Sequence, residues 1–313
     1  MFGFPTPASA RRLLVRQLPQ SSRPLPLRDQ TADPGLFGPG SVTWVVMREP
    51  RLLLAAGRAL LLQAANPLVA QGAIEHSTYK TDPYGRLERT VRWVTIVCFG
   101  TTAEAQRVSG RVNGLHERVE GYLPEGNATT RLPAGTPYSA SDPELLRWVH
   151  ASFVDTMLAA HDALVGGLTT AQRDAFVREW DAVARVMGLP KSRCWPDAAA
   201  LRRYVERQVR SGPALPGAGS REVAETVLHP PVRSPLLRPG TDTLAFIATG
   251  LLPDELRRGY GLTWTAAHRA AFETLTGSLR LATSALPRRL RVSPVYDLAL
   301  ARSEGRWPAQ RAA

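Results

Sequence analysis

Residues 142–167 read DPELLRWVHASFVDTMLAAHDALVGG and carry the longest helical pattern in the chain. Asp142 and Pro143 supply an N-cap residue and a first-turn proline, and Gly166–Gly167 ends the pattern. Between these ends, apolar residues return at the three- and four-residue spacing of one helix face. The stretch therefore predicts a helix over Pro143–Val165.

Similar start and stop signals divide most of the remaining chain into helices. Predicted helices cover Arg51–Ala65, Leu68–Ser77, Tyr84–Phe99, Thr102–Glu120, Ala171–Met187, Asp197–Ser211, Asp242–Leu251 and Thr265–Ala282. Tyr122–Ser141 is expected to form a loop, because prolines and glycines are frequent there. No run of alternating apolar and polar residues is long enough for a sheet, so the predicted fold class is all-α.

We expect a single domain. The chain has 313 residues, of which 44% are hydrophobic, and this is enough to bury one large core. The proline-rich residues 1–35 are expected to form an irregular tail. The helical domain is expected over residues 36–300, and residues 301–313 are expected to form a C-terminal tail.

The chain is strongly basic, with 39 Lys and Arg residues against 27 Asp and Glu and a formal net charge of +12. The cations are spread along the sequence, with small clusters at Arg202–Arg203 and Pro287–Arg289. Because a nucleic-acid site concentrates its cations and interleaves them with aromatics, nucleic acid is not expected as a partner. Attraction to an anionic membrane surface is left open.

The sequence predicts a cytoplasmic protein without stable membrane insertion. No stretch reaches the roughly 20 apolar residues that a membrane-spanning helix needs. Ser9–Leu14 contains a pair of arginines, as a twin-arginine export signal does, but no continuous apolar region follows it. Cys98 and Cys194 lie far apart in the sequence and are expected to be free thiols in a reducing compartment.

His150 is the most informative of the six histidines. Helical periodicity places it in an apolar stripe with Phe153 and Met157. An axial ligand of haem iron has to be a neutral imidazole held rigidly on an apolar helix, and Arg147 lies one turn earlier, where a propionate would be met. The alternative is that His150 is an ordinary core residue and that Arg147 faces solvent.

A second candidate group is carried by the predicted helix that follows Asp82. Arg86 and Thr90 are four residues apart and therefore project from one face of this helix. A guanidinium and a hydroxyl on an otherwise apolar face suit a pocket in which hydrogen-bond donors stabilise bound dioxygen. The alternative is that Arg86 pairs with Glu75 or Glu88 and that Thr90 bonds to its own helix.

Other catalytic motifs are weak or absent. The sequence contains no G-x-S-x-G elbow, no P-loop and no H-E-x-x-H motif. His150 and His161 have a spacing that allows both to face one groove, but a metal site between them would lack nearby acids. Asp155 and Asp162 are expected to face solvent.

A set of short motifs follows one another at defined spacing along the chain. They are Gly40–Trp44, Gln63–Pro67, Glu75–Ser77, Arg86–Thr90, Phe99–Gly100, Leu115–Gly121, Tyr138 with Asp142–Pro143, and Trp148–His150. In this order they resemble the bacterial MpaB-like and rubber-oxygenase family of catalytic domains. The resemblance covers about residues 36 to 290, which is most of the chain.

The resemblance implies an all-helical fold with a globin-like core around haem b. It implies His150 as the axial ligand of the iron, Arg147 or a neighbouring arginine at a propionate, and Arg86 with Thr90 on the distal side. Arg89 stands where the latex-clearing relatives have a lysine that caps the iron in a closed state. Arginine stays protonated and is a poor ligand, so an open distal site is expected.

The resemblance also implies a haem-b-dependent oxygenase that activates dioxygen and cleaves a carbon–carbon double bond of an isoprenoid or lipid-like substrate. The expected partners are a small apolar alkene and dioxygen. Polymeric rubber is not expected as the substrate, because this chain shows no export signal. Two alternatives stand beside the oxygenase: a haem-binding carrier or sensor without turnover, and a cofactor-free helical protein.

Some assignments are left undetermined by the sequence, among them the oligomeric state and the electron donor. His76 and His116 occupy family-like positions and are first assigned to packing and to hydrogen bonds between helices. Glu75 is a candidate distal base, and the role of His161 is undetermined.

Overall fold

The computed structural model describes residues 27, 29, 31–127, 129–232 and 234–306 of the chain. Within these ranges the fold is built of helices, and its regular β-structure is one small two-stranded sheet. The all-α class predicted from the sequence is confirmed, and the globin-like core stays a prediction. Most of the predicted N-terminal tail, residues 1–35, lies outside the described ranges.

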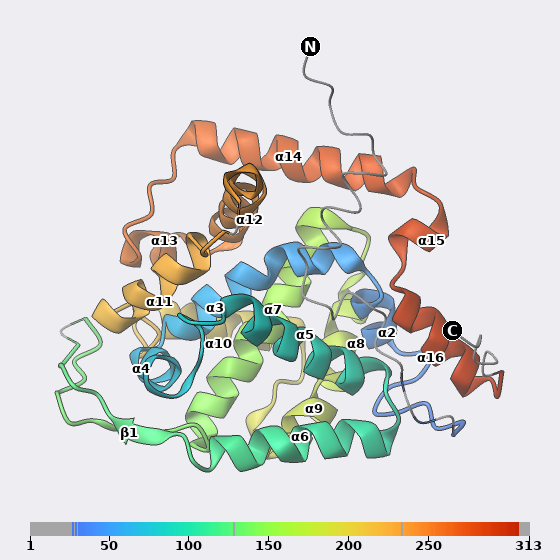
Figure 1. Cartoon of the computed structure of the whole chain (residues 1–313), viewed down its shortest axis with the longest axis horizontal. Coiled ribbons are helices and arrows are strands. Elements are labelled where there is room, and N and C mark those ends of the chain that lie inside the picture. The colour runs from blue at the N-terminus through green and yellow to red at the C-terminus, as the bar shows by residue number, and fades with distance from the viewer. Residues whose placement is uncertain (1–26, 28, 30, 128, 233, 307–313) are drawn as a thin grey trace.

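Helix α7 (Pro143–Leu164) runs through the middle of the molecule (Figure 1). The Asp142 carboxylate caps it by accepting a hydrogen bond from the Glu144 backbone N–H at 2.7 Å, and Gly166 and Gly167 follow it with φ of 79° and 85°. Four elements pack against α7: η2 (Pro50–Ala55), α3 (Ala56–Ala64), α10 (Ala198–Arg210) and α14 (Ala266–Ser284). The predicted helix is therefore the centre of the packing.

The N-terminal half supplies four further helices. They are α2 (Val42–Met47), α4 (Pro67–His76), α5 (Pro83–Phe99) and α6 (Thr102–His116). After the turn at Gly100, α6 packs along α5, and a capping box between Thr101 and Glu104 fixes its start. Asn66 caps α4 and Pro67 opens it, so the chain bends between α3 and α4.

The C-terminal half contains more helices than the sequence predicted. It comprises α8 (Thr170–Glu179), α9 (Asp181–Val186), η3 (Lys191–Arg193), α11 (Ala218–Leu228), η4 (Pro235–Leu237), α12 (Arg238–Leu251), α13 (Asp254–Gly259), α15 (Arg288–Arg291) and α16 (Pro294–Ser303). The predictions omitted α11, α13, α15 and α16, and they joined α8 and α9 into one helix. These helices are short, and short helices depend on tertiary packing more than on propensity.

The C-terminal tail predicted from residue 301 onward begins inside α16. Arg302 on this helix is 1% exposed and donates a hydrogen bond to the carbonyl oxygen of Phe99 at 2.8 Å. The predicted boundary at residue 300 thus cuts through an element that packs on the core.

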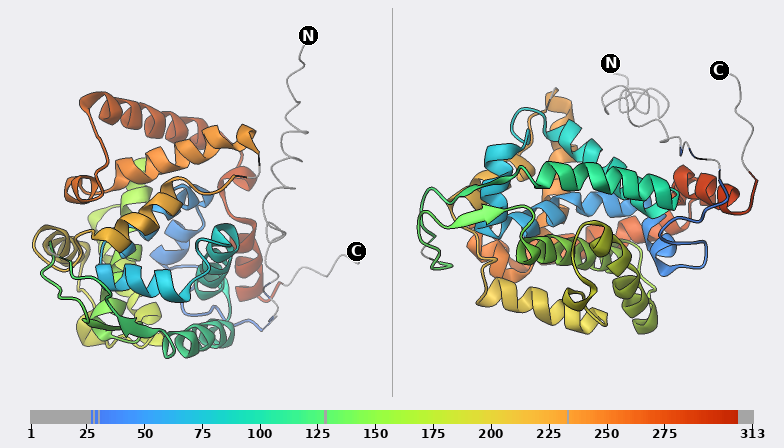
Figure 2. Two further views of the ribbon diagram at one scale, coloured as in Figure 1. Left: turned by 60° about the vertical axis from the view of Figure 1, so that its left-hand side comes forward. Right: turned by 90° about the horizontal axis from the view of Figure 1, so that it is seen from below.

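Two short strands lie at the start of the predicted loop Tyr122–Ser141 and inside it, and the helix predicted over Thr102–Glu120 ends earlier, at His116. Strands β1 (Glu120–Tyr122) and β2 (Pro137–Ser139) are antiparallel, with Gly121 paired to Tyr138. They lie just beyond the end of α6 (Figure 2). The pairing brings Tyr138 back to the helices at the site described below.

Two completely buried tryptophans of the core, Trp44 and Trp148, are anchored by hydrogen bonds. Trp44 Nε1 donates to the carbonyl oxygen of Cys98 at 2.8 Å, and Trp148 Nε1 donates to the carbonyl oxygen of Gln63 at 3.1 Å. A buried indole keeps its stabilising effect only when its N–H finds such a partner. Trp148 therefore fixes α7 against the end of α3.

No single helix among the described residues is long and apolar enough to cross a membrane. Pro50–Ala64 and Pro67–His76 pass the length and composition test only as a pair, and they are bent by 108° at the break between them.

Candidate functional site

A cavity of about 700 Å³ lies where the start of α5 meets the end of α6, and we refer to it as the α5–α6 cavity. Helices α4 and α7 and strand β2 complete its wall. Its polar lining includes Arg86, Thr90, His116, His76 and Tyr138. A volume of this size is within the usual range of small-molecule sites. The cavity is therefore the candidate functional site.

The positions of Arg86 and Thr90 follow from the way α5 begins. The Asp82 carboxylate accepts a hydrogen bond from the Gly85 backbone N–H at 2.9 Å, and Pro83 occupies the first turn. From this start, the i and i+4 spacing places Arg86 and Thr90 on one face, as the sequence predicted, and both line the cavity.

Arg86 carries a positive charge into the cavity without a partner. It makes no hydrogen bond or ion pair with any described residue, so the predicted pairing with Glu75 or Glu88 is not found. Burial and the neighbouring Arg89 lower the pKa of Arg86 from its usual value, and the group stays cationic at neutral pH. An unpaired, half-buried guanidinium suits an anionic or electron-rich ligand.

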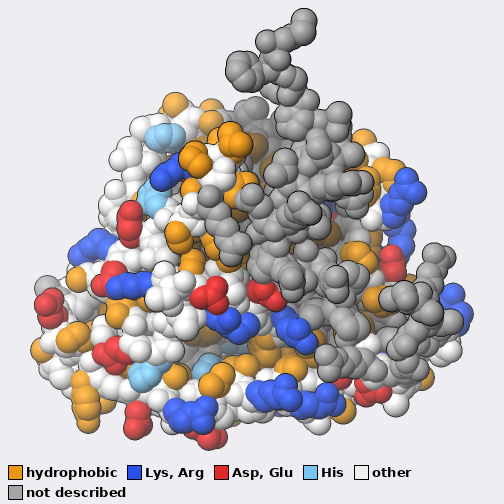
Figure 3. Space-filling model, in the orientation of Figure 1, with side chains coloured by type: hydrophobic (Ala, Val, Ile, Leu, Met, Phe, Trp, Pro, Cys, Tyr) orange, Lys and Arg blue, Asp and Glu red, His pale blue; other side chains and the backbone are white. Residues whose placement is uncertain are grey.

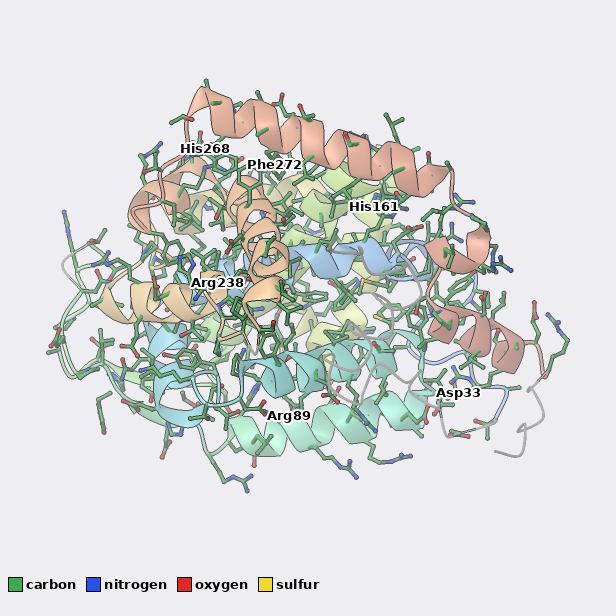
Figure 4. All side chains as sticks on the ribbon, turned by 45° about the horizontal axis from the view of Figure 1, so that its top comes forward. Asp33, Arg89, His161, Arg238, His268 and Phe272 are labelled. Carbon is green, nitrogen blue, oxygen red and sulfur yellow. The ribbon has the colours of Figure 1, made fainter. Side chains whose placement is uncertain are left out.

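Thr90 and Arg89 are both held by local bonds. Thr90 Oγ1 donates to the carbonyl oxygen of Arg86 at 3.1 Å, which is the back-bonding alternative named above. Arg89 pairs with Asp82 at 3.1 Å and donates to Thr78 Oγ1 at 2.9 Å. Figure 4 shows Arg89 on the α5–α6 side of the molecule. These bonds hold the Arg89 guanidinium at the start of α5.

His116 is the last residue of α6 and lines the same cavity as Arg86 and Thr90. Its side chain is half-buried, and its ring makes no hydrogen bond with a described residue. Burial lowers the pKa of His116 below its usual value, so the imidazole is neutral at pH 7. A neutral imidazole with free nitrogens is competent to bind a metal.

The other polar groups around the cavity are already engaged. Glu75 accepts hydrogen bonds from the Tyr138 hydroxyl and, at 2.6 Å, from Gln71 Nε2. The Tyr138 bond is the main reason that the pKa of Glu75 lies below its usual value. His76 Nε2 lies 3.1 Å from the carbonyl oxygen of Glu120. These contacts agree with the interhelical role expected for His76.

Two smaller cavities, each of about 180 Å³, extend from the same region between α3 and α5. Gln63 lines all three cavities, while Leu60 and Leu87 line both of the smaller ones. Their walls are mostly aliphatic, and Val94 and Phe153 close the second. Leu60 lines both of the smaller cavities, whereas its neighbours Leu61 and Leu62 are fully buried in the core.

The structure does not bring His150 to the same cavity. Its ring stacks on Trp195 with a centroid distance of 6.1 Å and an interplanar angle of 5°, and lies 6.3 Å from Trp180. The α7 residues that line the α5–α6 cavity are Leu145, Leu146 and Val149. One residue further along, the side chain turns by about 100° toward α8 and α10.

Arg147 lies on the same side of α7 as His150. Its guanidinium is 5.3 Å from the ring centroid of Trp195 and 4.6 Å from that of Tyr204, a distance typical of cation–π contacts. Its Nε is buried without a partner among the described residues. Arg147 is therefore neither at the α5–α6 cavity nor the solvent-facing side chain of the alternative interpretation.

The structure also shows where His161, Asp155 and Asp162 lie. His161 is 3% exposed with an unpartnered Nδ1, and the described residues contain no group of three His, Cys, Asp or Glu able to hold a metal ion. Figure 4 shows His161 below α14, away from Arg89. Asp155 and Asp162, expected to face solvent, instead pair with Arg58 at 2.6 Å and with Arg173 at 2.5 Å.

The lowered pKa of His150 predicts that the stability of the haem-free chain depends on pH. Burial lowers the pKa of His150 to about 4, against about 6.5 in an unfolded chain. Between these values the unfolded state binds more protons, so the free energy of unfolding should fall by up to about 1.4 kcal/mol for each pH unit below 6.5. Urea unfolding at pH 7, 6 and 5 measures this slope. His150→Phe should reduce it, and an unchanged slope would contradict the assignment.

The residues around the α5–α6 cavity fit a haem group. Haem requires a neutral imidazole on a helix, cations for its propionates and apolar walls for the macrocycle. His116 is such an imidazole, Arg86 is an unpaired cation, and Leu145, Leu146 and Val149 are apolar. From the sequence alone, His116 is expected to serve packing. The short turn between α5 and α6 could have indicated the role of His116. Two helices joined by a short turn pack side by side, so the end of α6 lies beside the start of α5.

A comparison with known protein families identifies the family of the chain. The family described as "ER-bound oxygenase mpaB/B'/Rubber oxygenase, catalytic domain" matches residues 43–281. No curated protein and no solved structure matches the chain. The matched range covers the α5–α6 cavity and more than half of the sequence. The chain therefore belongs to the mpaB and rubber-oxygenase family of oxygenase catalytic domains.

Proposed function

We propose that this oxygenase domain depends on haem b, with the haem in the α5–α6 cavity and His116 as the axial ligand. The observation that carries the proposal is that an unpaired, neutral imidazole and an unpaired guanidinium line the same cavity. Both groups are half-buried and have no partner among the described residues, so both are available to a ligand in the cavity.

His116 is preferred to His150 because of its neighbours. Arg86 and Thr90, the two residues expected beside dioxygen, share a cavity with His116, whereas His150 packs between Trp180 and Trp195. A ligand at His150 would bring the iron to a different side of α7 from Arg86. In that case Arg147 would be the nearby cation. The two assignments therefore predict that different substitutions weaken haem binding.

When bound, haem would supply the redox chemistry that activates dioxygen. The chain supplies orientation and polarity. Arg86 donates hydrogen bonds to oxygen atoms on which negative charge develops, and a guanidinium in a partly desolvated pocket stabilises such charge more than it would in water. Thr90 Oγ1 already donates its hydrogen bond to the carbonyl oxygen of Arg86, so Arg86 is the member of this pair that is free to donate to dioxygen.

The two smaller cavities suit the apolar part of a substrate. They meet the α5–α6 cavity at Gln63, and aliphatic side chains such as Leu60 and Leu87 form their walls. We propose a small apolar alkene, of isoprenoid or lipid-like chemistry, whose double bond is cleaved with dioxygen to carbonyl products. The apolar walls hold the chain and exclude water from the reacting end.

Oxygen uptake by haem-loaded protein tests this function. Addition of an apolar alkene, such as squalene, should raise the rate of oxygen uptake and yield carbonyl products. Arg86→Leu should lower this rate by about 100-fold, because one lost hydrogen-bond donor to developing charge costs about 10²–10³ in rate. Arg92→Leu, on an exposed part of the same helix, is the matched control and should keep the activity.

The result also separates the oxygenase from a carrier or sensor. A carrier or sensor would show a haem spectrum and bind dioxygen, but its oxygen uptake would not respond to the alkene. If several alkenes leave the rate unchanged while haem is bound, the proposed turnover is wrong. If Arg86→Leu keeps full activity, the assignment of the distal residues is wrong.

A further inference from the structure

We propose that the corner formed by the end of α14 and by α15 docks this protein on an anionic lipid bilayer. We call residues 280–291 the α14–α15 corner. The inference does not depend on the proposed haem chemistry, because it concerns a surface away from the α5–α6 cavity.

The α14–α15 corner exposes large apolar side chains to solvent. Leu281 is 74% exposed, Leu290 is 57% exposed and Leu286 is 38% exposed. Single exposed leucines are ordinary on a soluble protein, but three within ten residues form a patch that calls for a partner. The rest of α14 is also peripheral, and Thr276 is its one buried residue.

The same corner is strongly basic. It carries Arg280, Arg288, Arg289 and Arg291, and the sequence contains no acid between Glu273 and Asp297. Asp297 pairs with Arg288 at 2.7 Å, whereas Arg280 and Arg289 form no ion pair with any described residue. Figure 3 shows arginine and hydrophobic side chains next to each other where α14 meets α15. The corner therefore combines unneutralised charge with exposed leucines.

An anionic bilayer fits this combination better than the other candidates. Leucines entering the headgroup region and arginines above it are the mode by which amphipathic segments lie on membranes. A nucleic acid would satisfy the arginines but leave the leucines in water. It would also find no aromatic side chain for stacking, because residues 273–295 contain none.

The corner is held rigidly enough to act as one surface. Arg51 Nη1 donates to Thr283 Oγ1 at 2.7 Å and to the carbonyl oxygen of Leu164 at 3.2 Å, which ties the end of α14 to the end of α7. Val292, just after α15, is buried in the core. The leucines are therefore presented without an ordering cost on binding.

Co-sedimentation with vesicles tests the proposal on the full chain. We expect binding to vesicles of equal parts phosphatidylglycerol and phosphatidylcholine, and at least tenfold weaker binding to pure phosphatidylcholine. Arg280→Gln with Arg289→Gln should weaken binding about 25-fold, since each arginine near an anionic surface contributes about fivefold. Leu281→Ser with Leu290→Ser should weaken it at least about tenfold.

Matched variants elsewhere show whether the effect is local. Arg107→Gln with Arg111→Gln removes the same charge from the exposed face of α6, and Leu236→Ser removes a leucine that is 90% exposed. Both should bind within about threefold of the unmodified chain. Equal binding to neutral vesicles, equal losses in the matched variants, or displacement of the vesicles by a DNA duplex would each overturn the proposal.

Discussion

His116→Ala should abolish stable haem binding, so that protein produced with ample haem lacks the Soret band of the unmodified chain. The axial bond is the main attachment of iron to a b-type site, and loss of even an outer-shell partner costs about 10- to 100-fold in metal affinity. The loss on removal of the ligand itself should be at least 100-fold. Haem titration followed by visible absorbance measures it.

His150→Ala is the comparison that gives this result its meaning. It removes an imidazole from α7, outside the α5–α6 cavity, and should keep the Soret band. Added imidazole should restore part of the band in His116→Ala, because it refills the space that the side chain left. Loss of the band in His150→Ala alone would return the ligand to His150. A colourless unmodified protein would end the haem proposal.

Arg58→Leu should lower the free energy of unfolding by about 3–5 kcal/mol, because it leaves buried acceptors without a donor. Arg58 is 3% exposed. Its guanidinium binds Asp155 at 2.6 Å, Thr156 Oγ1 at 2.6 Å and the carbonyl oxygen of Leu251 at 2.8 Å. These bonds join α3, α7 and α12 at one point. Urea denaturation followed by circular dichroism measures the change.

Two variants test whether the buried charge causes this loss. Arg58→Leu combined with Asp155→Leu should recover part of the stability, because no charge is then left without its partner. Arg92→Leu, at an exposed position of α5, should change the stability by no more than about 0.5 kcal/mol. Equal losses in the single and the double variant would show that packing, and not the ion pair, is responsible.

The helices that the sequence predicted well are those with strong local signals. Pro143–Val165 was predicted and α7 is observed over Pro143–Leu164, since a capping aspartate, a first-turn proline and terminal glycines all act within one turn of the helix ends. The start of α5 after Asp82 follows the same rule. Helices α11, α13, α15 and α16 lack such a combination of length and caps, and packing forms them.

In the candidate site, too, some features follow from local sequence and others depend on packing between helices. The i and i+4 relation of Arg86 and Thr90 is a property of one helix, so the sequence was enough to place them on a common face. Which histidine meets them is a relation between helices. His116 and His150 both lie on helices with apolar neighbours, and only the packing of α6 along α5 distinguishes them.

The sequence by itself determined the all-α class, the family, the ends of the long helices and the pairing of Arg86 with Thr90. Local steric and hydrogen-bonding preferences act over a few residues, and these features need nothing more. The tertiary structure alone decided which imidazole shares the cavity with that pair, that Asp155 turns inward to Arg58, and that α16 closes on the core. Each of these depends on contacts between segments far apart in the chain, where a rotation of about 100° along a helix changes the neighbour that a side chain meets.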